Sequence, residues 1–114
     1  MGTGTTLETL RLKRIIANNY NINAKDVQGF MLGEHGNTAF PAWSTVSIGG
    51  IRLPDLDKYY HHQMPFNKAK TADLVVQTAY DVLKSKGWTN TGIAMGACYL
   101  AKSVFFNARC ITPV

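Results

Sequence analysis

The sequence has few cysteines, few acidic residues and no long hydrophobic run. Cys98 and Cys110 are too few for a disulfide framework, and their apolar neighbours predict that both are buried free thiols. The most apolar stretch, residues 91–106, contains Lys102 and is shorter than the roughly 20 residues that span a bilayer. With little cysteine and no secretory signal, the sequence predicts a cytoplasmic protein with no membrane partner.

Acidic residues are outnumbered by basic ones, with 7 Asp and Glu against 12 Lys and Arg and a formal net charge of +5. A positive charge can attract nucleic acid when the basic residues form a patch. Here they are dispersed, and Arg11, Lys13 and Arg14 are the one close group. We therefore expect no nucleic-acid partner. At 114 residues the chain has the length of one small domain.

Helical spacing of apolar residues predicts three long helices. Residues 5–20 are the first, and Thr5 with Glu8 three positions later is a capping box that satisfies the first free backbone N–H groups. Residues 67–86 are the second, with Gly87 as the stop signal. Residues 89–108 are apolar nearly all round, so this third helix should be buried.

Between the first two helices the pattern predicts strands. Residues 26–33 form a buried strand, and residues 43–54 contain Gly49-Gly50, a hairpin signal. Residues 55–66 are irregular or a short helix. The predicted fold class is α+β, with long helices packed on a small antiparallel sheet.

Three polar residues have both a structural and a chemical interpretation. Arg11 follows Glu8 by three positions, which favours a solvated ion pair on one helix face, but its planar guanidinium could also bind a carboxylate. His35 is either a polar loop residue or a proton-transfer group, since it lies between Gly33 and Gly36 directly after a predicted strand.

Thr89 caps the third helix or lends its hydroxyl to a ligand, and the pattern by itself favours the cap.

Two other motifs do not support a site. His61 and His62 are adjacent, so their side chains point apart, and no further residue completes a metal-ligand set. The segment "GTGTTL" lacks the third glycine of a dinucleotide-binding loop and follows no strand. The sequence thus predicts neither a metal site nor a cofactor-binding residue.

Three segments in this order and spacing, "GTGTTLETLR", "GEHGNTAFPAWS" and "KGWTNTGIA", resemble the L-lactate and L-2-hydroxyacid dehydrogenase family, within the lactate/malate dehydrogenase superfamily. The resemblance covers nearly all of this chain but only the middle of the family's polypeptide. It implies that residues 1–114 are a substrate-binding, C-terminal-type domain, truncated at both ends and lacking the NAD-binding Rossmann domain.

The resemblance also implies roles for individual residues. His35 matches the proton donor and acceptor, Glu8 the acid paired with it, Arg11 the substrate-carboxylate ligand and Thr89 a substrate-pocket residue. The family usually has aspartate where Glu8 stands, which is one methylene shorter.

The family's function is the NAD-dependent interconversion of a 2-hydroxy acid and a 2-oxo acid, with lactate and pyruvate as the expected pair and a homo-oligomer as the expected assembly. Since the resemblance implies that these 114 residues lack the NAD-binding part, we expect this chain alone to be inactive. The alternative is a non-catalytic fragment of the same family that serves oligomerisation or partner binding.

Overall fold

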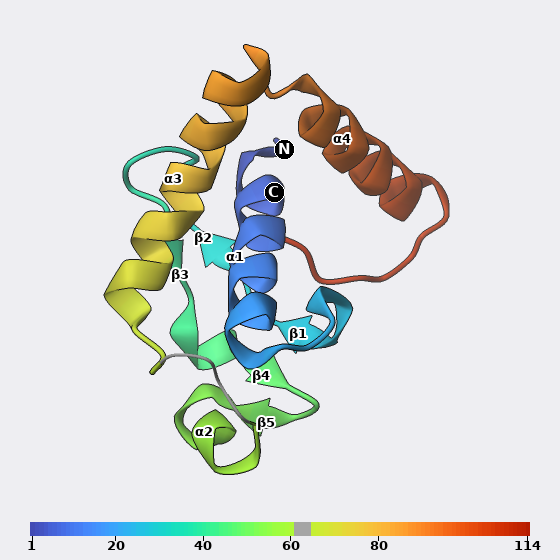
Figure 1. The fold of residues 1–114 in the computed structure, drawn as a ribbon. Helices are drawn as coiled ribbons and strands as arrows, with labels where there is room; N and C mark the ends of the chain where they lie inside the picture. The colour runs from blue at the N-terminus through green and yellow to red at the C-terminus, as the bar shows by residue number, and fades with distance from the viewer. Residues whose placement is uncertain (61–64) are drawn as a thin grey trace.

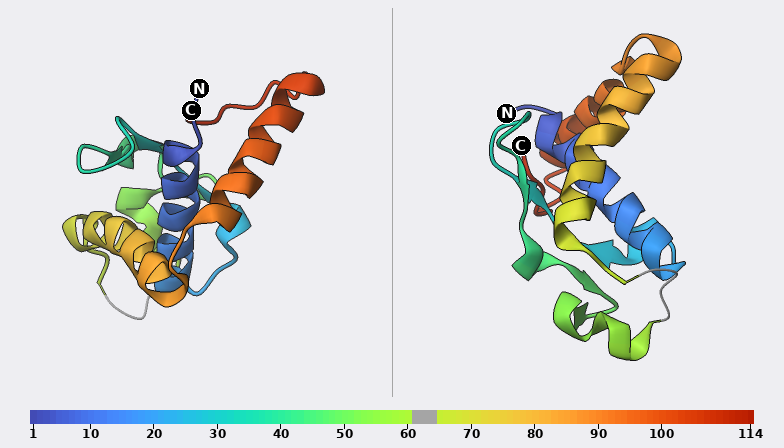
Figure 2. Two further views of the ribbon diagram at one scale, coloured as in Figure 1. Left: turned by 90° about the horizontal axis from the view of Figure 1, so that it is seen from above. Right: turned by 60° about the vertical axis from the view of Figure 1, so that its left-hand side comes forward.

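Helix α1 (Gly4–Tyr20) is the element around which the others pack. The structure, a computed structural model, describes residues 1–60 and 65–114. Figure 1 shows α1 between α3 (Lys68–Lys86) and α4 (Asn90–Phe105). The two chain ends lie close together near the start of α1 (Figure 2), where the Thr6 hydroxyl donates a hydrogen bond of 2.7 Å to the carbonyl of Pro113.

The strands are short and antiparallel. One sheet has the order β1-β4-β5, formed by Val27–Gln28, Ser47–Ile48 and Ile51–Arg52. The other pairs β2 (Met31–Leu32) with β3 (Phe40–Pro41). The short helix α2 (Leu56–Tyr59) follows β5. Together these elements confirm the predicted α+β class.

The predicted strand over residues 26–33 is wrong in one respect, because Gly29 divides it. Gly29 has a φ of +147°, which turns the backbone out of the strand conformation. Val27 therefore pairs with Ile48 in one sheet, whereas Met31 pairs with Pro41 in the other. The predicted hairpin at Gly49-Gly50 is confirmed, and both glycines have the positive φ that a tight primed turn needs.

The core lies between α1, α3 and the sheets. Its buried members are apolar residues from every layer, namely Leu12, Ile16, Ala17, Tyr20, Val27, Met31, Val46, Ile48, Leu53, Leu56 and Val75. The ends of α3 match the sequence: Asn67 accepts a hydrogen bond from the Lys70 N–H at 2.9 Å, and Gly87 ends the helix at a φ of +79°. Both are standard ways of satisfying free backbone groups at helix ends.

Helix α4 is not buried as predicted, because it packs on α1 by one narrow face. Gly92 approaches Leu7, Gly96 approaches Thr3, and Leu100 is buried. Small residues four positions apart let the two helices come close. The other faces carry exposed apolar residues, which are Ile93, Met95, Tyr99, Val104, Phe105 and Phe106.

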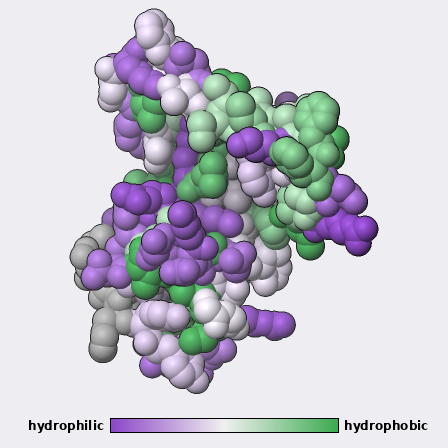
Figure 3. Space-filling model, turned by 90° about the vertical axis from the view of Figure 1, so that its right-hand side faces the viewer, coloured by the Kyte–Doolittle hydropathy of each residue, from purple (hydrophilic) through white to green (hydrophobic). Residues whose placement is uncertain are grey.

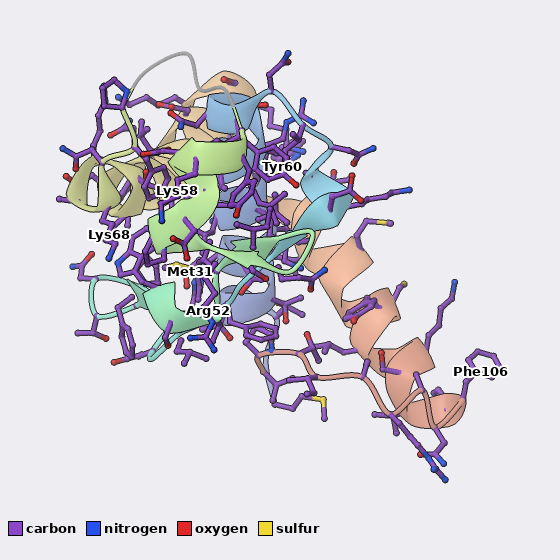
Figure 4. The ribbon with its side chains drawn as sticks, turned by 90° about the horizontal axis from the view of Figure 1, so that it is seen from below. Met31, Arg52, Lys58, Tyr60, Lys68 and Phe106 are labelled. Carbon is purple, nitrogen blue, oxygen red and sulfur yellow. The ribbon has the colours of Figure 1, made fainter. Side chains whose placement is uncertain are left out.

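Figure 3 shows this hydrophobic surface on the side where α4 lies, and in Figure 4 Phe106 projects from the end of α4 away from the rest of the molecule.

Both cysteines are exposed, which corrects the prediction of buried thiols. Cys98 lies on α4 and Cys110 in the segment that follows it, so both share the exposure of that region. A helix that is apolar all round needs partners on every side, whereas within the described residues the main packing partner of α4 is α1.

Candidate active site

His35 and Glu8 form a close pair. The His35 Nδ1 atom lies 3.1 Å from Oε1 of Glu8, while the side chains are 55% and 5% exposed, respectively. His35 thus sits at the surface with one ring nitrogen turned toward a buried carboxylate. This arrangement leaves the other ring nitrogen free of that carboxylate, and such a ring can exchange a proton with a bound molecule.

The loop that carries His35 is held by backbone and threonine contacts. It connects β2 to β3 and contains Gly33 and Gly36, whose φ angles are +91° and +144°. A Cβ at Gly33 would also come within 2.9 Å of the Thr38 carbonyl oxygen, so the tight turn needs glycine there. At the base of the loop, the Met31 N–H donates a hydrogen bond of 2.9 Å to the hydroxyl of Thr9. Since Thr9 follows Glu8 on α1, this bond fixes the loop beside the carboxylate.

Glu8 does not form the predicted capping box with Thr5. Helix α1 begins one residue earlier, at Gly4, with Thr3 at its N-cap position and no side-chain capping bond. The Glu8 carboxylate instead faces His35. Its second oxygen, Oε2, is buried and has no hydrogen-bond partner among the described residues. A buried ionised carboxylate is costly unless it is paired, so the contact with His35 is the interaction that compensates its burial.

Arg11 and Thr89 line one cavity of about 500 Å³ between α1, α3 and the start of α4. Two more basic residues, Arg14 and Lys86, line it as well. No acidic residue is among its lining residues, so the cavity presents positive charge in apolar surroundings. Such a cavity suits an anion, and a guanidinium fork suits a carboxylate in particular.

The predicted site residues thus fall into two pairs. Glu8 meets His35, and Arg11 faces the cavity with Thr89, so the solvated Glu8–Arg11 ion pair considered from spacing is absent from the described residues. Thr89 occupies the N-cap position of α4, but its side chain makes no capping bond. Neither His35 nor Glu8 lines the cavity.

The sequence reasoning missed two of the basic residues in this cavity. Arg14 lies one turn beyond Arg11 and could have been found from helical spacing. Lys86 comes from the end of α3, and no pattern in the sequence connects it to Arg11.

The described residues contain no group of three His, Cys, Asp or Glu side chains that could hold a metal ion. His61 and His62 lie outside the described residues. No helix in the described part of the chain is long and apolar enough to cross a membrane.

Comparison with known proteins defines the class to which this fold and these residues belong. Residues 5–114 match the family described as lactate/malate dehydrogenase, alpha/beta C-terminal domain. The chain therefore belongs to the lactate/malate dehydrogenase family, as a C-terminal domain.

Individual relatives are lactate dehydrogenases. The chain is 48% identical over 113 residues to an L-lactate dehydrogenase of Selenomonas ruminantium, covering 99% of this chain and 36% of that protein. It is 40% identical to L-lactate dehydrogenase 2 of Clostridium acetobutylicum, covering all of this chain and 36% of that protein.

A crystal structure of a lactate dehydrogenase from a Medee basin deep-sea metagenome library superimposes with a TM-score of 0.87 at 29% identity, over 96% of this chain and 35% of that one. The chain thus spans about a third of the length of these relatives.

Proposed function

We propose that this chain is the substrate-binding and catalytic domain of an NAD-dependent L-lactate or L-2-hydroxyacid dehydrogenase. The observation that carries this proposal is the contact of 3.1 Å between His35 and Glu8 at the surface of a domain of this family. Lactate and pyruvate are the proposed substrate pair, since the relatives are named L-lactate dehydrogenases. The assembly we propose is a cytoplasmic homo-oligomer.

His35 would accept the hydroxyl proton of the 2-hydroxy acid and return it to the carbonyl oxygen in the reverse direction. An imidazole ring can both accept and donate a proton, which suits both transfers. Glu8 would hold the ring in place through Nδ1 and stabilise the imidazolium that forms when the proton is accepted. A longer acid than the family's usual aspartate is compatible with this role here, because the two atoms already lie 3.1 Å apart.

Arg11 would bind the carboxylate common to 2-hydroxy and 2-oxo acids, with two parallel charge-assisted hydrogen bonds. Thr89 lines the same cavity and would contribute its hydroxyl. Such a substrate has a single carboxylate, which Arg11 binds. Arg14 and Lys86 would therefore add a general positive potential rather than further direct bonds.

The described residues do not fit a dinucleotide. Their strands are two residues long and antiparallel, and the glycine segment at residues 2–4 runs directly into α1 rather than forming a strand–turn–helix unit. Dinucleotides bind where a parallel strand, a glycine-rich turn and a helix meet. We therefore assign none of the described residues a role in binding NAD, and we expect the chain alone to be inactive.

A first experiment tests that expectation. Purified chain mixed with pyruvate and NADH should leave the absorbance at 340 nm unchanged. A steady decline that disappears in the His35→Asn variant would show that the chain holds the nicotinamide after all.

A second experiment tests the catalytic proposal. The 114 residues replace the aligned segment of the Selenomonas ruminantium enzyme, which is 48% identical to them. The chimera should reduce pyruvate, and His35→Asn should lower its kcat by about 10²–10⁴-fold, the range for loss of a general acid–base. An active chimera indifferent to His35→Asn would contradict the proposal.

The alternative is a non-catalytic fragment that serves oligomerisation or partner binding, and the exposed apolar residues of α4 are the observation that favours it. Sedimentation of the chain with and without Phe105→Ser and Phe106→Ser measures self-association through this region. Self-association together with an inactive chimera would favour the alternative.

A further inference from the structure

Gly4 is a glycine that the helix does not require. It is the first residue of α1, and its backbone is not in the positive-φ region that favours glycine. Glycine is the poorest helix former after proline, so alanine would stabilise α1 at this position if space allowed. The reason for glycine here must lie outside the helix itself.

That reason is the side chain of His35. A Cβ built on Gly4 would overlap Cβ and Cγ of His35 and lie 2.7 Å from its Cδ2, and these three are the atoms nearest to it. The overlap involves the base of the histidine side chain, which cannot swing aside as a flexible chain end could. A larger residue at position 4 would therefore displace the whole imidazole and the loop that carries it.

The same imidazole reaches Glu8, one helical turn beyond Gly4. Residues four apart lie on one face of a helix. The His35 side chain therefore packs against the backbone of Gly4 and reaches the carboxylate of Glu8. The loop itself gives little lateral support, since residues 34–37 are exposed. The ring is thus located by the surface of α1 more than by its own loop.

We propose that Gly4 is a positioning residue: the absence of a side chain there seats the His35 ring so that Nδ1 faces Glu8 and Nε2 remains available for proton exchange. The role given to Nε2 rests on the proposed function, whereas the position of the ring rests on geometry alone. An ionised carboxylate only accepts hydrogen bonds, so a neutral His35 in this position carries its proton on Nδ1.

The test uses the 114-residue chain labelled with ¹⁵N-histidine. Two-bond ¹H–¹⁵N correlation spectra identify which ring nitrogen of neutral His35 is protonated. The chain and its Gly2→Ala variant should both show Nδ1–H, because a Cβ at Gly2 meets no atom within 4 Å. Gly4→Ala should lose this tautomer in favour of the Nε2–H form. An unchanged His35 spectrum in Gly4→Ala would overturn the proposal.

A double variant covers the case in which Gly4→Ala does not fold. If the overlap is with His35, Gly4→Ala combined with His35→Ala should fold and should unfold at a higher urea concentration than His35→Ala alone, since alanine then improves the helix without hindrance. A double variant that is unfolded or less stable than His35→Ala would show that Gly4 serves another contact, and the proposal would be wrong.

The chimera described above separates this inference from the proposed function. Gly4→Ala should lower its kcat by about 10²-fold, the effect of misplacing a catalytic group by 1 Å, and leave KM nearly unchanged, because Arg11 binds the carboxylate. Gly2→Ala is the control. An inactive parent chimera would refute the proposed function and leave the tautomer result intact, whereas an active chimera with Gly4→Ala as fast as the parent would refute the positioning role.

Discussion

The Thr9 hydroxyl, on the buried face of α1, accepts a hydrogen bond of 2.9 Å from the Met31 backbone N–H at the start of β2. This bond joins the helix that carries Glu8 to the strand that leads to His35. Both partners are buried, so the bond does not compete with water. The relative position of the two proposed catalytic residues therefore depends on a threonine that has no part in the chemistry.

Thr9→Val should destabilise the chain, because the isosteric side chain leaves the buried Met31 N–H without an acceptor. The expected loss is about 1–3 kcal/mol in the free energy of unfolding, the cost of an unsatisfied buried donor. Urea unfolding followed by circular dichroism measures it. Thr78→Val is the matched control, since that hydroxyl bonds only to a carbonyl of its own helix and is exposed; it should change stability by less than about 0.5 kcal/mol. Equal effects of the two variants would contradict the role given to Thr9.

Leu12→Ala should lower the free energy of unfolding far more than Leu10→Ala, although both leucines lie on α1. Leu12 is fully buried, whereas Leu10 is 55% exposed. Truncation of a buried leucine removes transfer free energy and leaves a cavity, at a cost of about 2–5 kcal/mol. For Leu10 we expect a change below about 1 kcal/mol, since little burial is lost. Thermal unfolding of the two variants measures the difference, and similar melting temperatures would show that α1 faces the core differently.

Arg11→Gln should weaken substrate binding in the chimera more than Arg14→Gln, although both arginines line the same cavity. Loss of the bidentate contact to a substrate carboxylate costs about 1.5–3 kcal/mol per charged hydrogen bond, which corresponds to at least a tenfold rise in KM for pyruvate. Arg14→Gln removes only a neighbouring charge and should raise KM a few-fold. A larger effect of Arg14→Gln would move the carboxylate site one turn along α1.

Alkaline pH should destabilise the chain through Tyr20. Burial, with the hydrogen bond to Asp57 and its negative charge, raises the pKa of Tyr20 well above its ordinary value of 10. The folded chain thus keeps Tyr20 protonated where the unfolded chain ionises it. This contribution to stability is fully present below pH 10 and is lost as the pH rises above it toward the folded pKa.

Urea midpoints at pH 7 and at pH 11 measure this effect. The difference between the two midpoints should shrink in Tyr20→Phe, which keeps the ring contacts with Tyr60 and Phe66 but cannot ionise. Tyr59→Phe is the control because that side chain is 68% exposed. An equal pH dependence in Tyr20→Phe and the parent chain would contradict the assignment.

Local patterns predicted the elements that depend on neighbouring residues. The helix predicted over residues 67–86 with its Gly87 stop, and the Gly49-Gly50 hairpin, follow from short-range geometry. The capping bond of Asn67 was not predicted. The capping box failed because Glu8 had two possible partners, and the spacing to Thr5 could not reveal the second. Gly29 was likewise predicted to be part of a strand, because the periodicity of apolar residues carries no information about the φ angle.

The sequence by itself determined the family, through motifs that carry His35, Arg11 and Thr89, and the helices, through apolar spacing and end signals. Only the tertiary structure decided which of these residues meet: Glu8 with His35 over the bare backbone of Gly4, and Arg11 with Thr89, Arg14 and Lys86 around a cavity. It also decided that α4 covers α1 by its glycine face and leaves the rest exposed. The physical reason is range, since propensity acts between neighbours in the chain, whereas a site is made by packing residues that the chain holds far apart.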